Sequence, residues 1–177
     1  MFIIKYFIIM AITISTNLTI IDFNENSNLL GWRLVDDVVM GGQSNGRFNI
    51  NSEGHATFYG AISTANNGGF SSLRHRFKKL DVSKFETIKI RLKGDGKKYQ
   101  FRVKPNQFNQ ISYTTYFQTK TEWETIEIRL ADLIPTFRGR TLEMENYAGN
   151  ELEEIGFLIG NKKNEQFQLI IDRIILE

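Results

Sequence analysis

The sequence predicts an all-β protein, an antiparallel β-sandwich or jelly roll of about ten strands with little helix. Apolar and polar residues alternate along most of the chain, as in ETIKIRL (86–92), where Ile88, Ile90 and Leu92 share one face. Such short runs recur roughly every ten residues and are separated by clusters of Gly, Asn and Asp. No segment carries a sustained apolar stripe at helical spacing, so the pattern favours sheets over helices.

The composition is that of an ordinary globular domain. The chain has 177 residues, of which 41% are hydrophobic and 24% charged. Lys and Arg number 22 against 20 Asp and Glu, a net charge of +2, and no Lys/Arg-rich run stands out. This balance argues against a nucleic-acid partner. Cysteine is absent, which excludes disulfides, thiolate nucleophiles and Cys-based zinc sites.

The first residues differ from the rest. Residues 1–16 contain a single charge, Lys5, and the apolar run Tyr6–Ile14 is too short to span a bilayer, which takes about 20 residues. With small residues at Thr13–Ser15, this pattern predicts a cleaved signal peptide over 1–16, followed by one domain over 17–177. We therefore expect an extracytoplasmic protein, periplasmic or secreted, with no transmembrane span in the mature chain. A buried N-terminal strand, in a cytoplasmic and membrane-associated protein, is the alternative.

The strand candidates follow from the alternation. In chain order they are Ile20–Phe23, Arg47–Asn51, His55–Tyr59, Phe70–Phe77, 86–92, 99–103, Ile111–Phe117, 124–130, Ile155–Ile159 and Phe167–Leu176. Asp95-Gly96 between two of them predicts a β-hairpin. Residues 81–85 and 130–134 could each form one helical turn. The continuous apolar character of the last candidate predicts a central strand covered on both faces.

No motif predicts catalysis. The glycine pairs in MGGQSNG (40–46) and NNGGF (66–70) fit neither phosphate-binding spacing, so they favour tight turns over nucleotide binding. Of the two histidines, His55 begins a strand and His75 shares an apolar face, which favours a half-buried histidine over a base or ligand. No nucleophile–base set is recognisable. We therefore predict a protein that is not an enzyme and has no cofactor, while a bound calcium ion stays open.

Two arginine-containing segments are candidates for a binding surface. In FSSLRHRF, alternation places Phe70, Ser72, Arg74 and Arg76 on the face opposite the apolar one. In IPTFRGR (134–140), Arg138 and Arg140 flank a glycine. Arginine beside aromatic residues suits recognition of carboxylates, sugars or protein partners. A solvated surface without a ligand is the alternative.

A third candidate is the segment DDVVMGGQS (36–44). Asp36, Asp37 and Ser44 can bond backbone N–H groups, as turn residues do, or they can face a ligand. Trp32 and residues 38–40 are expected to pack against the end of the sandwich. The sequence leaves the structural and the functional alternative open.

Several motifs in register resemble one known family. They are WRLVDDVVMGGQS (32–44), NGGFSSLR (67–74), RLKGDGKKY (91–99), YFQT (116–119) with Trp123, IPTFRGR (134–140) and EIGFLIG (154–160). From about Ile20 onward the chain resembles the NADH:ubiquinone oxidoreductase complex I intermediate-associated protein 30 family.

The resemblance implies a galactose-binding-like jelly roll without established catalytic residues. It also implies a chaperone-like assembly factor that binds a protein partner, such as incomplete subunits of a respiratory complex. The alternative is a carbohydrate-binding module of the galactose-binding-like superfamily, with a glycan as ligand.

Overall fold

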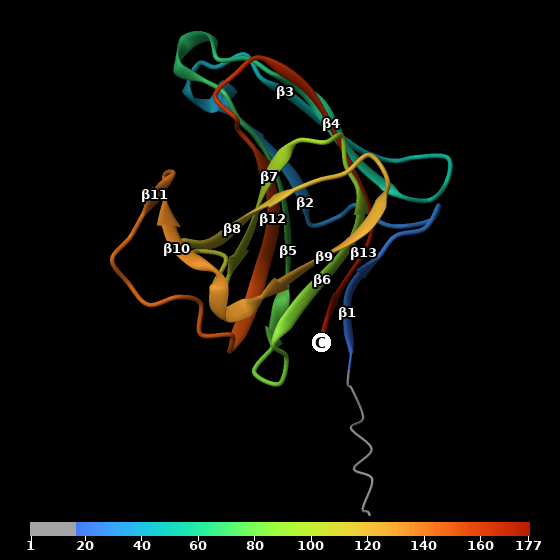
Figure 1. Cartoon of the computed structure of the whole chain (residues 1–177), viewed down its shortest axis with the longest axis vertical. Helices are drawn as coiled ribbons and strands as arrows, with labels where there is room; N and C mark the ends of the chain where they lie inside the picture. The colour runs from blue at the N-terminus through green and yellow to red at the C-terminus, as the bar shows by residue number, and fades with distance from the viewer. Residues whose placement is uncertain (1–16) are drawn as a thin grey trace, which may run out of the picture.

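The computed structural model describes residues 17–177, which form two antiparallel β-sheets packed face to face (Figure 1). The predicted signal peptide, 1–16, lies outside the described residues. The strands are β1 (Leu18–Asp22), β2 (Trp32–Asp36), β3 (Asn45–Ile50), β4 (Ala56–Ile62), β5 (Ser71–Asp81), β6 (Thr87–Lys93), β7 (Lys98–Lys104), β8 (Ser112–Gln118), β9 (Trp123–Arg129), β10 (Ile134–Phe137), β11 (Arg140–Thr141), β12 (Glu151–Ile159) and β13 (Glu165–Leu176). Three short 3₁₀ turns are interspersed: η1 (Asp37–Met40), η2 (Ala65–Asn67) and η3 (Leu130–Asp132).

The six-stranded sheet has the order β3-β4-β13-β6-β9, and β1 also pairs with β13. The seven-stranded sheet has the order β11-β10-β8-β7-β12-β5-β2. Figure 1 shows β10 and β11 at the left margin of the molecule, and β1 and β13 toward the right. Strands far apart in sequence are neighbours in both sheets, as expected for a jelly roll. The predicted all-β fold class is confirmed.

The core lies between the sheets and contains the apolar residues that the alternation selected. Ile88, Ile90, Phe101 and Phe157 are fully buried. The rings of Phe101 and Phe157, on neighbouring strands β7 and β12, lie 5.4 Å apart between centroids. Because side chains alternate along each strand, placing these residues inward sends their sequence neighbours to the outer faces.

All ten strand candidates correspond to strands of the structure, whereas β2, β10 and β11 were missed. β10 contains Pro135, which ordinarily argues against a strand but is tolerated near a sheet edge. β11 has only two residues. η3 confirms a helical turn within 130–134, but 81–85 holds the end of β5 and a non-helical turn.

The predicted hairpin at Asp95-Gly96 is wrong. β6 belongs to the six-stranded sheet and β7 to the seven-stranded one, so the connection crosses between layers. The backbone on either side of the turn bonds to the β8–β9 connection: Gly94 donates to the Lys120 carbonyl at 2.9 Å, and Thr119 donates to the Lys97 carbonyl at 3.0 Å. The two connections therefore stabilise each other at one end of the sandwich.

The last strand is central, as predicted, but it is covered on one face only. β13 pairs with β4 and β1 on one side and with β6 on the other. Gln166 and Gln168 nevertheless point to solvent. Among residues 17–177, no helix is long and apolar enough to cross a membrane.

Candidate binding face

The outer face of the seven-stranded sheet collects most of the polar residues that are buried in this protein. Leu73, Phe101 and Phe157 point into the core, so the residues on either side of them along each strand point outward. We call this outer surface the polar face. Seven polar residues on it are at most 8% exposed, namely Ser72, Gln100, Lys104, Ser112, Thr114, Thr136 and Glu154. An outer sheet face is ordinarily solvated, so buried polar residues are unusual there and call for an explanation.

Cross-strand register arranges the polar face in rows. In one row Glu154 of β12 lies between Arg76 of β5 and Lys104 of β7. The Arg76 Nε donates to the Glu154 carboxylate at 2.6 Å. Lys104 Nζ donates to the carbonyl of Asn109 at 2.6 Å. Glu154 is only 4% exposed, so a buried carboxylate here compensates the basic groups beside it.

The next row also has basic residues on both sides of β12, but it has no carboxylate. It runs across β2, β5, β12, β7 and β8 as Arg33, Arg74, Gly156, Arg102 and Thr114. No ion pair joins any of these three arginines to a carboxylate of the described residues. Arg74 Nε has only a long contact, 3.5 Å, to the Ser72 hydroxyl.

The basic groups of the polar face disfavour one another's charge. Burial lowers the pKa of Arg74; Glu154 opposes this, while Arg33 and Arg76 lower the pKa further. Burial, and then the charge of Arg74, lower the pKa of Arg102. Burial is also the main cause that lowers the pKa of Lys104, where Glu154 again acts in the opposite direction. The charge of an anion placed on this face would offset the cost of burying the basic groups and their mutual repulsion.

The segment DDVVMGGQS forms a polar latch beside this sheet. Asp37 is fully buried, and its carboxylate accepts hydrogen bonds from the Ser44 amide at 3.0 Å and the Ser44 hydroxyl at 2.6 Å. It also accepts from the amides of Gly69 and, at 3.2 Å, Phe70. Burial by itself would raise the pKa of Asp37, but the hydrogen bonds prevail and lower it. Asp37 therefore fastens the turn before β3 to the turn before β5.

Asp36 makes a second connection of the same kind. Its carboxylate accepts from the Gly46 amide at 2.9 Å and from the Ser71 hydroxyl at 2.5 Å. The glycines of both motifs leave room for these carboxylates. A Cβ on Gly42 would lie 2.2 Å from an Asp37 oxygen, and a Cβ on Gly68 would lie 2.5 Å from the other. The geometry favours the structural alternative for Asp36, Asp37 and Ser44.

The neighbours of the latch follow the expectation in part. Trp32 packs on the core, 5.0 Å from the Phe48 ring and stacked on His75 at 4.5 Å. Val38, by contrast, is 59% exposed, so it does not pack inward as expected. The side chains of Val39 and Met40 lie outside what the structure describes. His75 is half-buried as predicted, and burial lowers its pKa.

The remaining predicted residues do not form one cluster. Ser72, Arg74 and Arg76 lie on the polar face, and Phe70 lies just before β5. Arg138 lies between β10 and β11, and Arg140 begins β11, at the edge of the sheet far from β5. Strands β8, β7 and β12 separate β10 from β5.

Sequence reasoning missed the other half of the polar face. Placing Tyr99, Phe101 and Val103 inward also places Gln100, Arg102 and Lys104 outward, and this consequence of the alternation was not used. Arg33 was missed together with β2. No local pattern in the sequence predicts that β5, β12 and β7 are neighbours.

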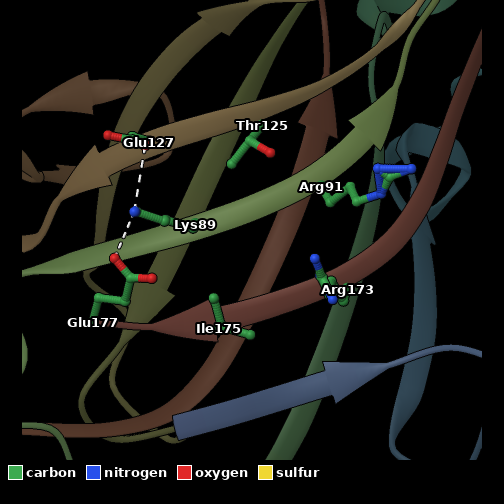
Figure 2. Close-up of a pocket in the computed structure, with 7 residues that line it drawn as sticks. All are labelled: Lys89, Arg91, Thr125, Glu127, Arg173, Ile175 and Glu177. Carbon is green, nitrogen blue, oxygen red and sulfur yellow. Dashed lines mark ion pairs between the residues drawn. The ribbon is translucent and has the colours of Figure 1, made fainter. Parts of the chain in front are cut away.

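Two shallow pockets lie elsewhere and contain none of the predicted residues. The first, of about 280 Å³, lies on the outer face of the six-stranded sheet (Figure 2). There Lys89 Nζ lies 2.5 Å from a carboxylate oxygen of Glu177 and 3.5 Å from one of Glu127, so its charge is already compensated. The second, of about 330 Å³, lies among loops around Leu130 and Tyr147. We therefore take the polar face as the candidate site.

Comparison with known families identifies the fold and the lineage. The family described as complex I intermediate-associated protein 30 (CIA30) matches residues 21–171, most of the chain. The chain belongs to the CIA30 family. A mouse relative, mitochondrial complex I intermediate-associated protein 30, is 23% identical over 86% of this chain and 53% of its own length. The chain thus spans about half the length of the curated relative that it matches.

Solved structures share the sandwich of this CIA30 chain. A family 11 carbohydrate-binding module from Clostridium thermocellum, in complex with a β-1,3-1,4-mixed-linked tetrasaccharide, has a TM-score of 0.66 at 16% identity. That match covers 90% of this chain and 94% of the module. The agarase AgWH50C has a TM-score of 0.62 at 10% identity, over 92% of this chain and 25% of the agarase. At these identities the likeness shows the fold, a galactose-binding-like jelly roll, and no more.

Proposed function

We propose that this CIA30 chain is a non-enzymatic binding protein that holds a protein partner on its polar face, in the manner of an assembly factor. The observation that supports this most is that four buried or half-buried basic residues of the polar face, Arg74, Arg76, Arg102 and Lys104, lie around a single buried carboxylate, Glu154. Charged residues are buried in this way at some cost, and a partner that supplies the missing interactions would compensate it. The family to which the chain belongs is named for an intermediate of complex I, which makes a protein partner the first candidate.

A carbohydrate ligand is the second candidate, because a module of the same fold was solved with a mixed-linked tetrasaccharide. Sugar-binding faces of proteins use free aromatic rings as stacking platforms. On the polar face the exposed ring of this kind is Tyr116, which is 57% exposed. The Lys98 ammonium lies 4.4 Å from the centroid of that ring and so occupies one of its faces. This contact favours a protein partner over a neutral glycan.

Site-specific photocrosslinking tests the proposal. A photoreactive phenylalanine derivative at position 116 should crosslink a defined protein in cells that express the chain naturally. The same group at Thr125, exposed on the six-stranded sheet, is the matched control and should not capture that protein. Calorimetric titration with a mixed-linked β-glucan tetrasaccharide examines the second candidate. Glucan binding that is lost in Tyr116→Ala, without a crosslink specific to position 116, would replace the first candidate with the second.

We also propose that the protein acts outside the cytoplasm after cleavage within residues 1–16. The apolar run beside Lys5 and the small residues at 13–15 support this location. N-terminal sequencing of protein from the native host should begin near Thr16. Cytoplasmic protein that retains Met1 would contradict the proposal.

A further inference from the structure

Two neighbouring rows of the polar face differ in one residue that matters chemically. Outward positions 154 and 156 are consecutive on that side of β12, so they lie about 7 Å apart. At the first, Glu154 places a carboxylate between Arg76 and Lys104. At the second, Gly156 places no side chain between Arg74 and Arg102. A carboxylate of the chain thus lies between the basic residues of one row, and none lies between those of the next.

Glycine is required at position 156 by its neighbour. A Cβ there would lie 2.9 Å from the Leu73 carbonyl oxygen, closer than real Cβ atoms come to backbone. The strip of bare backbone between the two arginines is therefore built into the packing of β12 against β5. Strands lie about 4.8 Å apart, so Arg74 and Arg102 flank this strip at a backbone separation of roughly 10 Å. Two long guanidinium side chains can converge on a small group held between them.

Two buried polar atoms in the row of Gly156 have no hydrogen-bond partner among the described residues. They are the Nε of Arg102 and the Oγ1 of Thr114. Thr114 is directly opposite Arg102 and only 1% exposed. Native proteins rarely leave such groups unpaired, and each one calls for an explanation. A carboxylate brought by a partner and held over Gly156 would satisfy the Arg102 Nε once this side chain turns toward it, whereas Thr114 lies two strands from Gly156.

On these grounds, and resting on the proposed function, we propose that Arg74, Gly156 and Arg102 form a subsite for one carboxylate group of an acidic side chain in the partner protein. The carboxylate lies over Gly156, between the two guanidinium groups, and takes the part that Glu154 takes in the adjacent row. Arg33 extends the positive charge of the row toward the sheet edge.

A peptide carboxylate fits the surroundings better than the carboxylate of a uronic-acid sugar. The row continues past Thr114 to Ile134, an apolar side chain that is 37% exposed. Ile134 lies three strands, roughly 14 Å, from Gly156, so it can pack against an apolar residue about four positions from the acidic one in an extended peptide, whereas a hydroxyl-rich ring gains little from it. Lys98 also covers one face of the nearby Tyr116 ring.

The test is a titration of the full-length protein with three probes at physiological salt: a hexaglutamate peptide, a hexaglutamine peptide and a hexagalacturonate oligosaccharide. In ¹⁵N-labelled wild-type protein, hexaglutamate should move the Arg102 Nε–Hε resonance, and hexaglutamine should not. By calorimetry, Arg74→Gln and Arg102→Gln should each weaken hexaglutamate binding about tenfold, the loss of one charge-assisted contact. Arg47→Gln, a matched loss of one arginine from β3 on the other sheet, should change it less than about twofold.

Each outcome decides a separate point. If hexagalacturonate binds more tightly than hexaglutamate through the same arginines, the assignment to a peptide is overturned. If Arg47→Gln weakens binding as much as Arg102→Gln, only net charge matters and the subsite is overturned. If the Arg102 resonance does not move in the titration, but photocrosslinking at position 116 captures a protein, the subsite is overturned and the binding function stands. If the Arg102 resonance moves with hexaglutamate, but no protein is captured at position 116, the carboxylate subsite stands and the proposed binding of a protein partner is overturned.

Discussion

Replacing Asp37 with Asn tests whether the latch is structural. The change keeps the shape of the side chain and removes its charge. Asp37 is fully buried and accepts four hydrogen bonds, from the Ser44 amide and hydroxyl and from the amides of Gly69 and Phe70. An asparagine has one acceptor oxygen and an NH₂ group, which cannot accept.

The magnitude follows from how these bonds are divided. Three donors point to Oδ2 and one, the Ser44 amide, to Oδ1. The best placement of the new amide keeps three bonds, now to a neutral oxygen, and sets its NH₂ against the Ser44 N–H. Hydrogen bonds to charged groups contribute about 1.5–3 kcal/mol each and neutral ones about 1. Summed with allowance for relaxation, Asp37→Asn should lower the free energy of unfolding by about 2–4 kcal/mol.

The effect should depend on pH in a defined direction. The pKa of Asp37 is lower in the folded protein than in the unfolded chain, where it is about 4. Above that pH both states are ionised and the full stabilisation is present. Below it the unfolded chain takes up the proton first, so the stabilisation declines as the pH falls toward the folded pKa. The difference between wild type and Asp37→Asn should therefore be largest near neutrality and shrink below about pH 4.

Urea unfolding followed by tryptophan fluorescence and circular dichroism, at about pH 7 and about pH 3.5, measures both quantities. Asp132→Asn, at an exposed position in η3, is the matched control and should stay within about 0.5 kcal/mol of wild type. Ser44→Ala combined with Asp37→Asn should be less destabilising than the sum of the two single changes, because both act on one network. A value for Asp37→Asn within about 0.5 kcal/mol of wild type near neutral pH would refute the latch.

Three further predictions concern single positions. Thr114→Val should raise the free energy of unfolding by about 1 kcal/mol, because it replaces a buried hydroxyl without a described partner by a methyl group; a lower urea midpoint would show that the hydroxyl is satisfied in solution. Gly68→Ala should lower the free energy of unfolding by about 2–3 kcal/mol, because its Cβ would lie 2.5 Å from an Asp37 oxygen. Gly96→Ala, at a φ of 76° with open space around it, should lower the same quantity by only about 1 kcal/mol. Equal losses of the two variants in thermal melts would contradict the contact at Gly68. The pKa of His75, followed by NMR, should lie below about 6.5, because the side chain is half-buried. The unfolded chain then binds the proton more readily than the folded one, so the free energy of unfolding should decrease as the pH falls through that value. A titration midpoint above about 6.5 would contradict the burial argument.

Much of the fold can be predicted from local sequence. A period of two assigns each residue of a strand to one face, so the spacing of Ile88, Ile90 and Leu92 is enough to identify them as core residues. The same rule placed Ser72, Arg74 and Arg76 on an outer face. Applied to the polar residues of 99–103, the same rule also places Arg102 on an outer face. The motifs shared with the CIA30 family predicted the jelly-roll fold and the family to which the chain belongs.

The sequence by itself could not determine which strands are neighbours. Backbone hydrogen bonds are the same for every residue, so pairing carries no local mark, and the turn at Asp95-Gly96 can close a hairpin or cross between sheets equally well. The choice depends on how both apolar faces pack into a single core. Only that packing brings Arg74 of β5, Gly156 of β12 and Arg102 of β7 into one row. It also buries Asp37 among donors from two loops, an arrangement that no local pattern of the sequence could predict.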